Sequence, residues 1–145
     1  MTTAKNFFTP EEEQQIVDAI TVAEKNTSGE IRVHMENHSE KPPLERAQEV
    51  FHLLGMDNTA ARNGVLFYLA TEDRTFAIIG DEGIDKAVEN DFWDCTKDVV
   101  IGHFKENRFA QGLAEGILRA GDRLKEYFPY AEDDTNELPN EISKN

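Results

Sequence analysis

The stretch NGVLFYLATEDRTFAIIGDEG, residues 63–83, contains two runs of apolar residues separated by a short polar segment. Residues 65–70 and 75–79 each have the length of a β-strand, and residues 71–74 between them have the polar character of a turn. The two runs therefore predict an antiparallel hairpin. The second run leads directly into two acidic residues flanked by glycines.

A further strand is predicted upstream, at residues 30–36, where apolar and polar residues alternate strictly. Its apolar side consists of Ile31, Val33 and Met35, and its polar side of Arg32, His34 and Glu36, as expected for a half-buried strand. Apolar residues at helical spacing predict a helix over residues 44–54. Because this helix connects the strand to the hairpin, we expect a parallel strand pair with a right-handed crossover.

Three more helices are predicted. Thr9, Pro10 and the acids that follow are typical of a helix start, and this helix should end within residues 26–29. The others should cover residue 91 to about 104 and residue 110 to about 127. In the former we expect Phe92, Cys95, Val99 and His103 to share the inner side, and in the latter a stripe of Gly112, Gly116 and Ala120 should admit a neighbouring backbone. The elements together predict an α/β domain.

The 145 residues suffice for one hydrophobic core, so we expect one domain over residues 1–129 and a partly flexible acidic tail over 130–145. The net charge of −14 argues against nucleic acid as a partner. No apolar run has the length of a signal peptide or a membrane span, which predicts a cytoplasmic protein without membrane insertion. With one cysteine, Cys95, no intrachain disulfide forms, and we expect it to be buried and inert.

The predicted topology brings three glycine-containing turns to one edge of the sheet: residues 28–30, 63–64 and 80–83. This places Glu30, Asp81, Glu82 and Asp85 towards one another, with Asp91 nearby in sequence. Clustered carboxylates favour a bound cation, and calcium and magnesium prefer such oxygen ligands. The metal-site hypothesis therefore names these five residues.

A plainer interpretation stays open, in which Asp81 and Glu82 form a solvated turn and Asp91 caps the helix after it. The opposite edge gathers a second, lower-ranked acidic set, namely Glu36, Asn37, His38, Glu72 and Asp73. Here ordinary turn chemistry is the better interpretation of Glu72 and Asp73.

Other motifs are absent from the sequence. The segment beginning at Asp81 has Lys86 where an EF-hand loop needs glycine and Phe92 where it needs glutamate, and no phosphate-binding glycine motif occurs. His34 and His38 do not share a helix, so we interpret them as surface histidines. His52 and His103 lie in helical segments, where a packing or capping role is expected.

Four segments in order resemble the TPM domain family: SGEIRVH at residues 28–34, ARNGVLFYLATEDRTFAIIGDEGI at 61–84, HFKENRFAQGLAEGI at 103–117 and NELPNEIS at 136–143. The resemblance implies a small mixed sheet sandwiched between α-helices. In some members it also implies calcium binding, and in the plant member acid phosphatase activity. It implies functional positions at Asp81 and Glu82 and at Ser28, Gly29 and Glu30, and with less weight at Asp91.

Three functions follow as hypotheses. The first is a calcium- or magnesium-binding module that presents its loops to a protein partner. The second is a metal-dependent acid phosphatase, for which only Arg32, Arg62 and Lys86 near the predicted edge would offer positive charge to a phosphate. The third is an acidic scaffold domain without a ligand.

Overall fold

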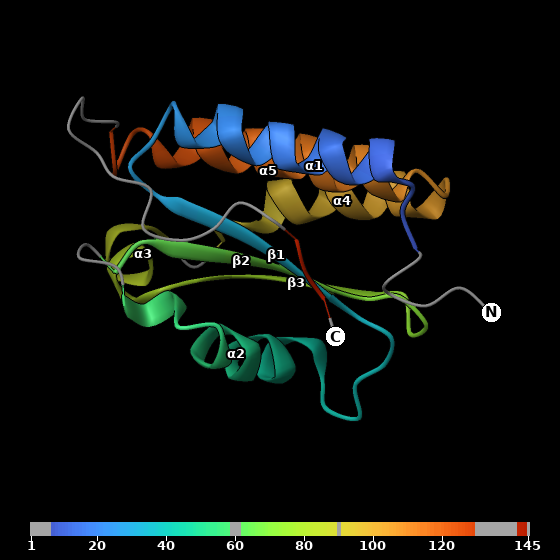
Figure 1. Cartoon of the computed structure of the whole chain (residues 1–145). Helices are drawn as coiled ribbons and strands as arrows, with labels where there is room; N and C mark the ends of the chain where they lie inside the picture. Colours follow the sequence, from blue (N-terminus) through green and yellow to red (C-terminus); the bar gives the residue numbers. More distant parts are fainter. Residues whose placement is uncertain (1–6, 59–61, 90, 130–141, 145) are drawn as a thin grey trace.

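The computed structural model of the chain describes residues 7–58, 62–89, 91–129 and 142–144. In chain order the elements are α1 (Pro10–Glu24), β1 (Glu30–Glu36), α2 (Pro43–Leu53), the 3₁₀ helix η2 (Met56–Asn58), β2 (Gly64–Ala70), β3 (Thr75–Gly80), α3 (Glu82–Ala87), α4 (Asp94–Lys105), α5 (Phe109–Leu124) and β4 (Ser143–Lys144). Figure 1 shows the sheet as the middle layer, with α1, α4 and α5 over one face and α2 over the other. The predicted α/β fold, a small mixed sheet between helices, is confirmed.

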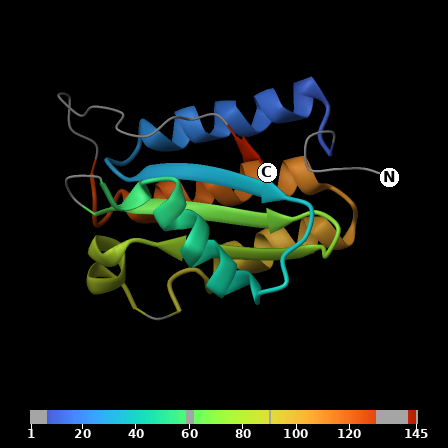
Figure 2. The same ribbon diagram turned by 60° about the horizontal axis from the view of Figure 1, so that its bottom comes forward.

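The strand order in the sheet is β3-β2-β1-β4. β1 and β2 are parallel, with Glu30 opposite Gly64, and β2 and β3 are antiparallel, with Val65 opposite Gly80. Both pairings agree with the sequence prediction. In the turned view of Figure 2, α2 lies in front of the sheet and crosses its face.

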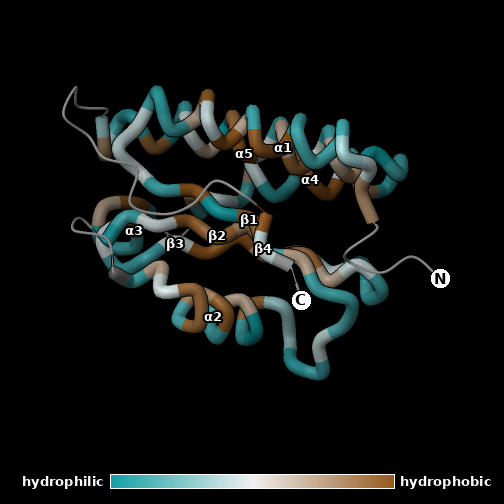
Figure 3. The backbone as a smooth tube through the Cα atoms, viewed as in Figure 1, coloured by the Kyte–Doolittle hydropathy of each residue, from teal (hydrophilic) through white to brown (hydrophobic). Residues whose placement is uncertain are grey.

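Each face of the sheet has its own hydrophobic cluster. The larger one packs Val33, Phe67 and Ile117 between the sheet and the three-helix layer, and the smaller one packs Phe51, Leu66 and Tyr68 beneath α2. Figure 3 shows apolar residues along the central strands and on the helices that cover them. A sheet covered on both sides holds its strand ends in fixed positions, which is what any site at its edges requires.

The prediction that β1 is only half buried is wrong. Six of its seven residues are buried, and Arg32 alone is intermediate. The polar side faces the α2 layer, so His34 is only 3% exposed and Glu36 only 4%. His34 is therefore not a surface histidine.

The helix start of α1 agrees with prediction. The Thr9 hydroxyl accepts a hydrogen bond from the Glu12 backbone N–H, and the Glu12 carboxylate accepts one from the Thr9 N–H, which completes a capping box. Ile16, Ile20 and Ala23 then form part of the buried side of the helix.

The predicted phase of α4 is wrong. The helix begins at Asp94 and not at residue 91, so the spacing counted from Phe92 does not continue through it. Its buried residues are Thr96 and Val100, whereas Cys95 is exposed and not a core residue. Likewise Asp91 is not the cap of this helix, because Trp93 occupies that position.

The small residues of α5 permit close packing, as predicted. A methyl group at Gly112 would lie 2.9 Å from the Cβ of His103, and one at Gly116 would overlap Val100, both on α4. On the other side, a methyl group at Gly121 would lie 2.8 Å from the Cβ of Ala23 on α1. The glycines therefore bring α5 against both neighbouring helices.

Three elements were not predicted: the 3₁₀ helix η2, the short helix α3 and the edge strand β4. β4 pairs in parallel with β1, with Ser143 opposite His34. It belongs to the predicted tail, and residues 130–141 and 145 of that tail lie outside the described residues. Among the described residues, no helix has the length and apolar character needed to cross a membrane.

Candidate functional site

Hydrogen bonds join the three turns that were predicted to meet. The Glu30 N–H donates to the carbonyl oxygen of Asn63 at 3.2 Å, and the Asp81 N–H donates to that of Gly64 at 2.8 Å. The Asn63 side-chain amide donates to the Ser28 carbonyl oxygen at 3.2 Å. The beginnings of β1 and β2 and the end of β3 therefore form one edge of the sheet.

Asp81 is buried at this edge, where it caps α3. Its Oδ1 accepts the Glu82 backbone N–H at 2.7 Å. The Arg62 guanidinium donates from Nε to Oδ2 at 2.9 Å and from Nη2 to Oδ1 at 3.1 Å. This two-point contact compensates the negative charge of a carboxylate that has lost most of its water.

The backbone also holds Arg62 in place. Its φ of 51° lies in the left-handed region, and its carbonyl oxygen accepts the Gly83 N–H at 2.8 Å. A non-glycine residue in this region is uncommon, and such residues concentrate at functional sites. The sequence offered Arg62 as a cationic group but did not show that it pairs with Asp81.

A hollow of about 380 Å³ lies beside Asp81, between α2 and α3. Its walls include the acids Asp81, Glu82 and Asp85, together with Lys86 and His52. Glu82 accepts a hydrogen bond from Lys86 at 2.6 Å, and this contact is the main reason that its pKa is lowered. Three of the five predicted metal-site residues thus share one cavity.

Asp85 differs from its neighbours. Within the described part of the chain, no lysine, arginine or histidine pairs with its carboxylate, which is exposed at the rim of the hollow. Its pKa is raised, first by loss of hydration and then by the negative charge of Asp81. A cation in the hollow would relieve both effects.

The remaining two predicted residues lie apart from this hollow. Glu30 is buried on β1, with β2 between it and Asp81, and Phe51 and Met56 pack over the intervening Gly64. Asp91 is exposed in the turn before α4. In the ranges that the structure describes, no group of three or more His, Cys, Asp or Glu side chains has a geometry ready to hold a metal ion.

The opposite edge carries a buried polar cluster that sequence reasoning missed. The Glu36 carboxylate accepts hydrogen bonds from Nε and Nη2 of Arg46, both at 2.8 Å, and from the Tyr68 hydroxyl. The Nε2 of His34 lies 3.5 Å from Glu36, and its Nδ1 is 2.9 Å from the Ser143 hydroxyl on β4. Alternation marked Glu36 and His34 as one polar side of β1, but only the contacts with Arg46, Tyr68 and Ser143 show that this side is enclosed.

Burial dominates the electrostatics of this cluster. It lowers the pKa of His34 and, together with the hydrogen bond to Glu36, raises that of Tyr68. Glu36 and Arg46 form the charged pair of the cluster. We interpret it as structural, because its charges compensate one another.

The other histidines and the hairpin turn make side-chain contacts with acids. Asp73 accepts the Ser39 N–H at 2.9 Å and contacts His38 at 2.6 Å, so this turn residue also fixes the segment after β1. His38 is exposed, as predicted. His52 contacts Asp57 at 3.0 Å, and His103 contacts Glu115 on α5 at 2.6 Å.

The architecture is that of an α/β domain whose mixed sheet carries helices on both faces, with acids gathered where β3 passes into α3. The chain belongs to the TPM domain family, whose model matches residues 1–123. This confirms the resemblance found in the sequence.

Solved structures agree with the family assignment. The chain is similar to the BA42 protein from the psychrophilic bacterium Bizionia argentinensis, with 57% identity, a TM-score of 0.91 and 96% of each chain covered. The fold also resembles that of the N-terminal domain of a protein from P. gingivalis, with 18% identity, a TM-score of 0.69 and coverage of 87% of this chain and 83% of that one. The fold is also similar to that of the N-terminal domain of the cg2496 protein from Corynebacterium glutamicum. The two chains are 14% identical, the TM-score is 0.64, and the match covers 95% of this chain and 80% of that one. Among curated proteins, none matches the chain.

Proposed function

We propose that this TPM domain is a divalent-cation-binding module whose site is the hollow beside Asp81, Glu82 and Asp85. The observation that carries the proposal is the place of Asp85, whose carboxylate lines the hollow with Asp81 and Glu82 and has no cationic partner among the described residues. Its pKa is raised, first by loss of hydration and then by the negative charge of Asp81. Calcium and magnesium suit this site, since both take carboxylate and carbonyl oxygens.

Arg62 and Lys86 should lower the affinity of the hollow for a divalent cation. Both already contact acids of the hollow, at distances of 2.9 Å from Asp81 and 2.6 Å from Glu82. A cation that recruits these carboxylates has to compete with the two side chains, so we expect weak affinity, on the order of 0.1 to 1 mM. Displacement of Arg62 and Lys86 would also rearrange the surface around α3, which is how the site would signal to a protein partner.

Calcium titration followed through backbone amide resonances tests the proposal, with magnesium as competitor. The largest shifts should fall within residues 80–87, and Asp85→Asn should weaken binding about tenfold, because it removes one charged ligand. Asp98→Asn on the exposed side of α4 is the control and should leave binding unchanged. Shifts confined to other regions, or equal affinity in the two variants, would refute the site.

Glu30 and Asp91, the two predicted ligands that lie apart from the hollow, are each tested by a separate variant. If Glu30→Gln or Asp91→Asn weakens calcium binding as much as Asp85→Asn does, the site extends beyond the hollow. We expect neither to do so, because β2 separates Glu30 from the hollow and Asp91 lies in a different turn.

A metal-dependent acid phosphatase is the second candidate. The observation in its favour is Arg62, a guanidinium beside the acids whose side chain is 43% exposed and could contact a phosphate. Hydrolysis of a phosphomonoester by the wild type, lost in Asp81→Asn while the fold is retained, would support it. Asparagine preserves the helix cap at this position, so the variant separates charge from folding.

The third candidate, an acidic scaffold without a ligand, makes a simple contrary prediction. Millimolar calcium would then leave the melting temperature unchanged, whereas binding to the folded state raises it.

A further inference from the structure

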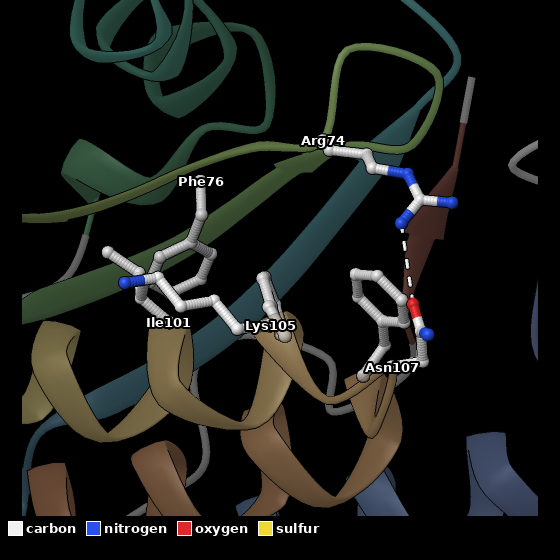
Figure 4. Close-up of a pocket in the computed structure, with 7 residues that line it drawn as sticks. Arg74, Phe76, Ile101, Lys105 and Asn107 are labelled. Carbon is white, nitrogen blue, oxygen red and sulfur yellow. Dashed lines mark hydrogen bonds between the residues drawn. The ribbon is translucent and has the colours of Figure 1, made fainter.

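A second hollow of about 380 Å³ lies at the other end of β3, where the hairpin turn approaches the end of α4. We name it the aromatic pocket. Figure 4 shows Arg74 reaching it from the hairpin turn, while Ile101, Lys105 and Asn107 reach it from α4 and the turn after it. Thr75 begins β3 beside this pocket and Gly80 ends it beside the acidic hollow, so the two cavities are separate.

The wall of the aromatic pocket is made of phenylalanine rings in edge-to-face and tilted contact. Phe76 and Phe104 lie 5.5 Å apart edge to face, and Phe104 and Phe109 lie 4.8 Å apart. Phe67 in the core continues the series, 6.0 Å from Phe76. The rings are thus anchored in the core, while Ile101 at the mouth remains 37% exposed. A preformed apolar wall of this kind is typical of small-molecule sites.

Two cations stand at this pocket in a protein of net charge −14. Arg74 lies over the Phe109 ring, 5.7 Å from its centroid, and donates to the Oδ1 of Asn107 at 3.4 Å. Among the described residues, no carboxylate pairs with Arg74 or Lys105. The neighbouring acids are engaged elsewhere, Asp73 by His38 and Glu106 by Arg108.

The backbone conformation helps to hold Arg74 and Asn107 at the pocket. Arg74 has φ 55° and Asn107 has φ 61°, both in the left-handed region. Asparagine is common in this conformation after a helix, whereas arginine is not. Arg74 is therefore the strained residue of the two, and its guanidinium lies at the pocket.

We propose that the aromatic pocket binds a small organic anion that joins an apolar body to one carboxylate, such as an arylalkanoic acid. The apolar body would contact Phe76, Phe104 and Ile101, and the carboxylate would accept hydrogen bonds from Arg74. The Lys105 ammonium lies at the other end of the pocket, beside Ile101, and would add to the attraction for an anion through its charge. The volume favours a free small molecule, because cavities of about 300 to 1,000 Å³ are usual for such ligands. The two unpaired cations favour an acid over a neutral compound.

Amide resonance titration with 3-phenylpropanoate, and with 3-phenylpropanamide as its uncharged analogue, tests the proposal. A ligand of this size should bind with a dissociation constant on the order of 1 mM. We expect shifts at residues 74–76 and 101–109, and at least fivefold weaker binding of the amide, because it lacks the charge. Equal binding of acid and amide, or shifts in other regions only, would overturn the proposal.

Two matched lysine variants on α4 test whether the positive charge at the pocket attracts the anion. Lys105→Gln should weaken binding of 3-phenylpropanoate about threefold, whereas Lys97→Gln, which lies outside the pocket on α4, should not. Arg74→Asn removes the guanidinium but suits the left-handed backbone, and we expect about fivefold weaker binding. If neither Lys105→Gln nor Arg74→Asn affects the acid, the assigned anion site is wrong.

Discussion

Arg62 and Asp81 form a two-point ion pair across the turns that precede β2 and follow β3, with nitrogen to oxygen distances of 2.9 and 3.1 Å. The pair links a residue held at positive φ to the cap of α3. It also means that the acidic hollow is already partly neutralised from within the chain. Cation binding at this edge is therefore an exchange of one positive partner for another.

Removing the guanidinium tests this exchange. Arg62→Gln leaves the buried Asp81 carboxylate without its cation, so we expect a lower unfolding free energy and a lower melting temperature in the absence of metal. In return, calcium should raise the melting temperature of this variant more than that of the wild type. Thermal melts with and without calcium measure both effects. Arg119→Gln, on the exposed side of α5, should match the wild type, and an equal calcium response in Arg62→Gln would show that Asp81 takes no part.

The buried Glu36 cluster should be sensitive to loss of its one carboxylate. Glu36→Gln leaves Arg46, whose side chain is 18% exposed, without a charged partner on β1, and we expect a cost of about 3 kcal/mol in urea unfolding. Glu49 also contacts Arg46, but its side chain is 38% exposed. Glu49→Gln should therefore cost much less than Glu36→Gln. Similar losses in the two variants would contradict the structural role assigned to Glu36.

Periodicity identified the elements that have a strong internal pattern. Strict alternation predicted β1, continuous apolar runs predicted β2 and β3, and the polar turn between them predicted their antiparallel pairing. From these pairings the meeting of three turns at one edge followed without further information. Local pattern and chain connectivity are sufficient for this level of structure.

What periodicity missed depends on contacts distant in sequence. The enclosure of Glu36 arises because Arg46 of α2 and Tyr68 of β2 close over its carboxylate, and alternation alone is the same for a covered and an exposed side. The exposure of Cys95 follows from a helix start three residues later than predicted. α3 is only six residues long, too short for a recognisable apolar period, although Asp81 is an ordinary capping residue.

Two histidines should give opposite pH dependences of stability. The folded-state pKa of His34 is lowered by burial, so its contribution is present above the unfolded value of 6.5 and is lost as pH falls from there through the folded value. The pKa of His38 is raised by its hydrogen bond with Asp73, so its contribution is present below the unfolded value and lost as pH rises through the folded one. Urea unfolding between about pH 7.5 and pH 5.5 measures the sum.

Variants separate the two. His34→Gln should abolish most of the acid destabilisation, while His38→Gln should make it steeper, because the opposing contribution is gone. An unchanged slope in His34→Gln would show that His34 is not the group that carries the effect.

The contact between α5 and α4 depends on a missing methyl group at Gly116. A Cβ at this position would overlap the Cγ2 of Val100 and lie 3.3 Å from the Phe67 ring, so neither neighbour can move without disturbing the core. We expect Gly116→Ala to lower the unfolding free energy by about 2 kcal/mol, despite the better helix propensity of alanine. Gly102 is the matched control, since it is exposed on α4 and a Cβ there would have no heavy atom within 4 Å. Gly102→Ala should stabilise by about 0.5 to 1 kcal/mol. If both variants gain stability in urea unfolding, the two helices are not held together as closely as the structure places them.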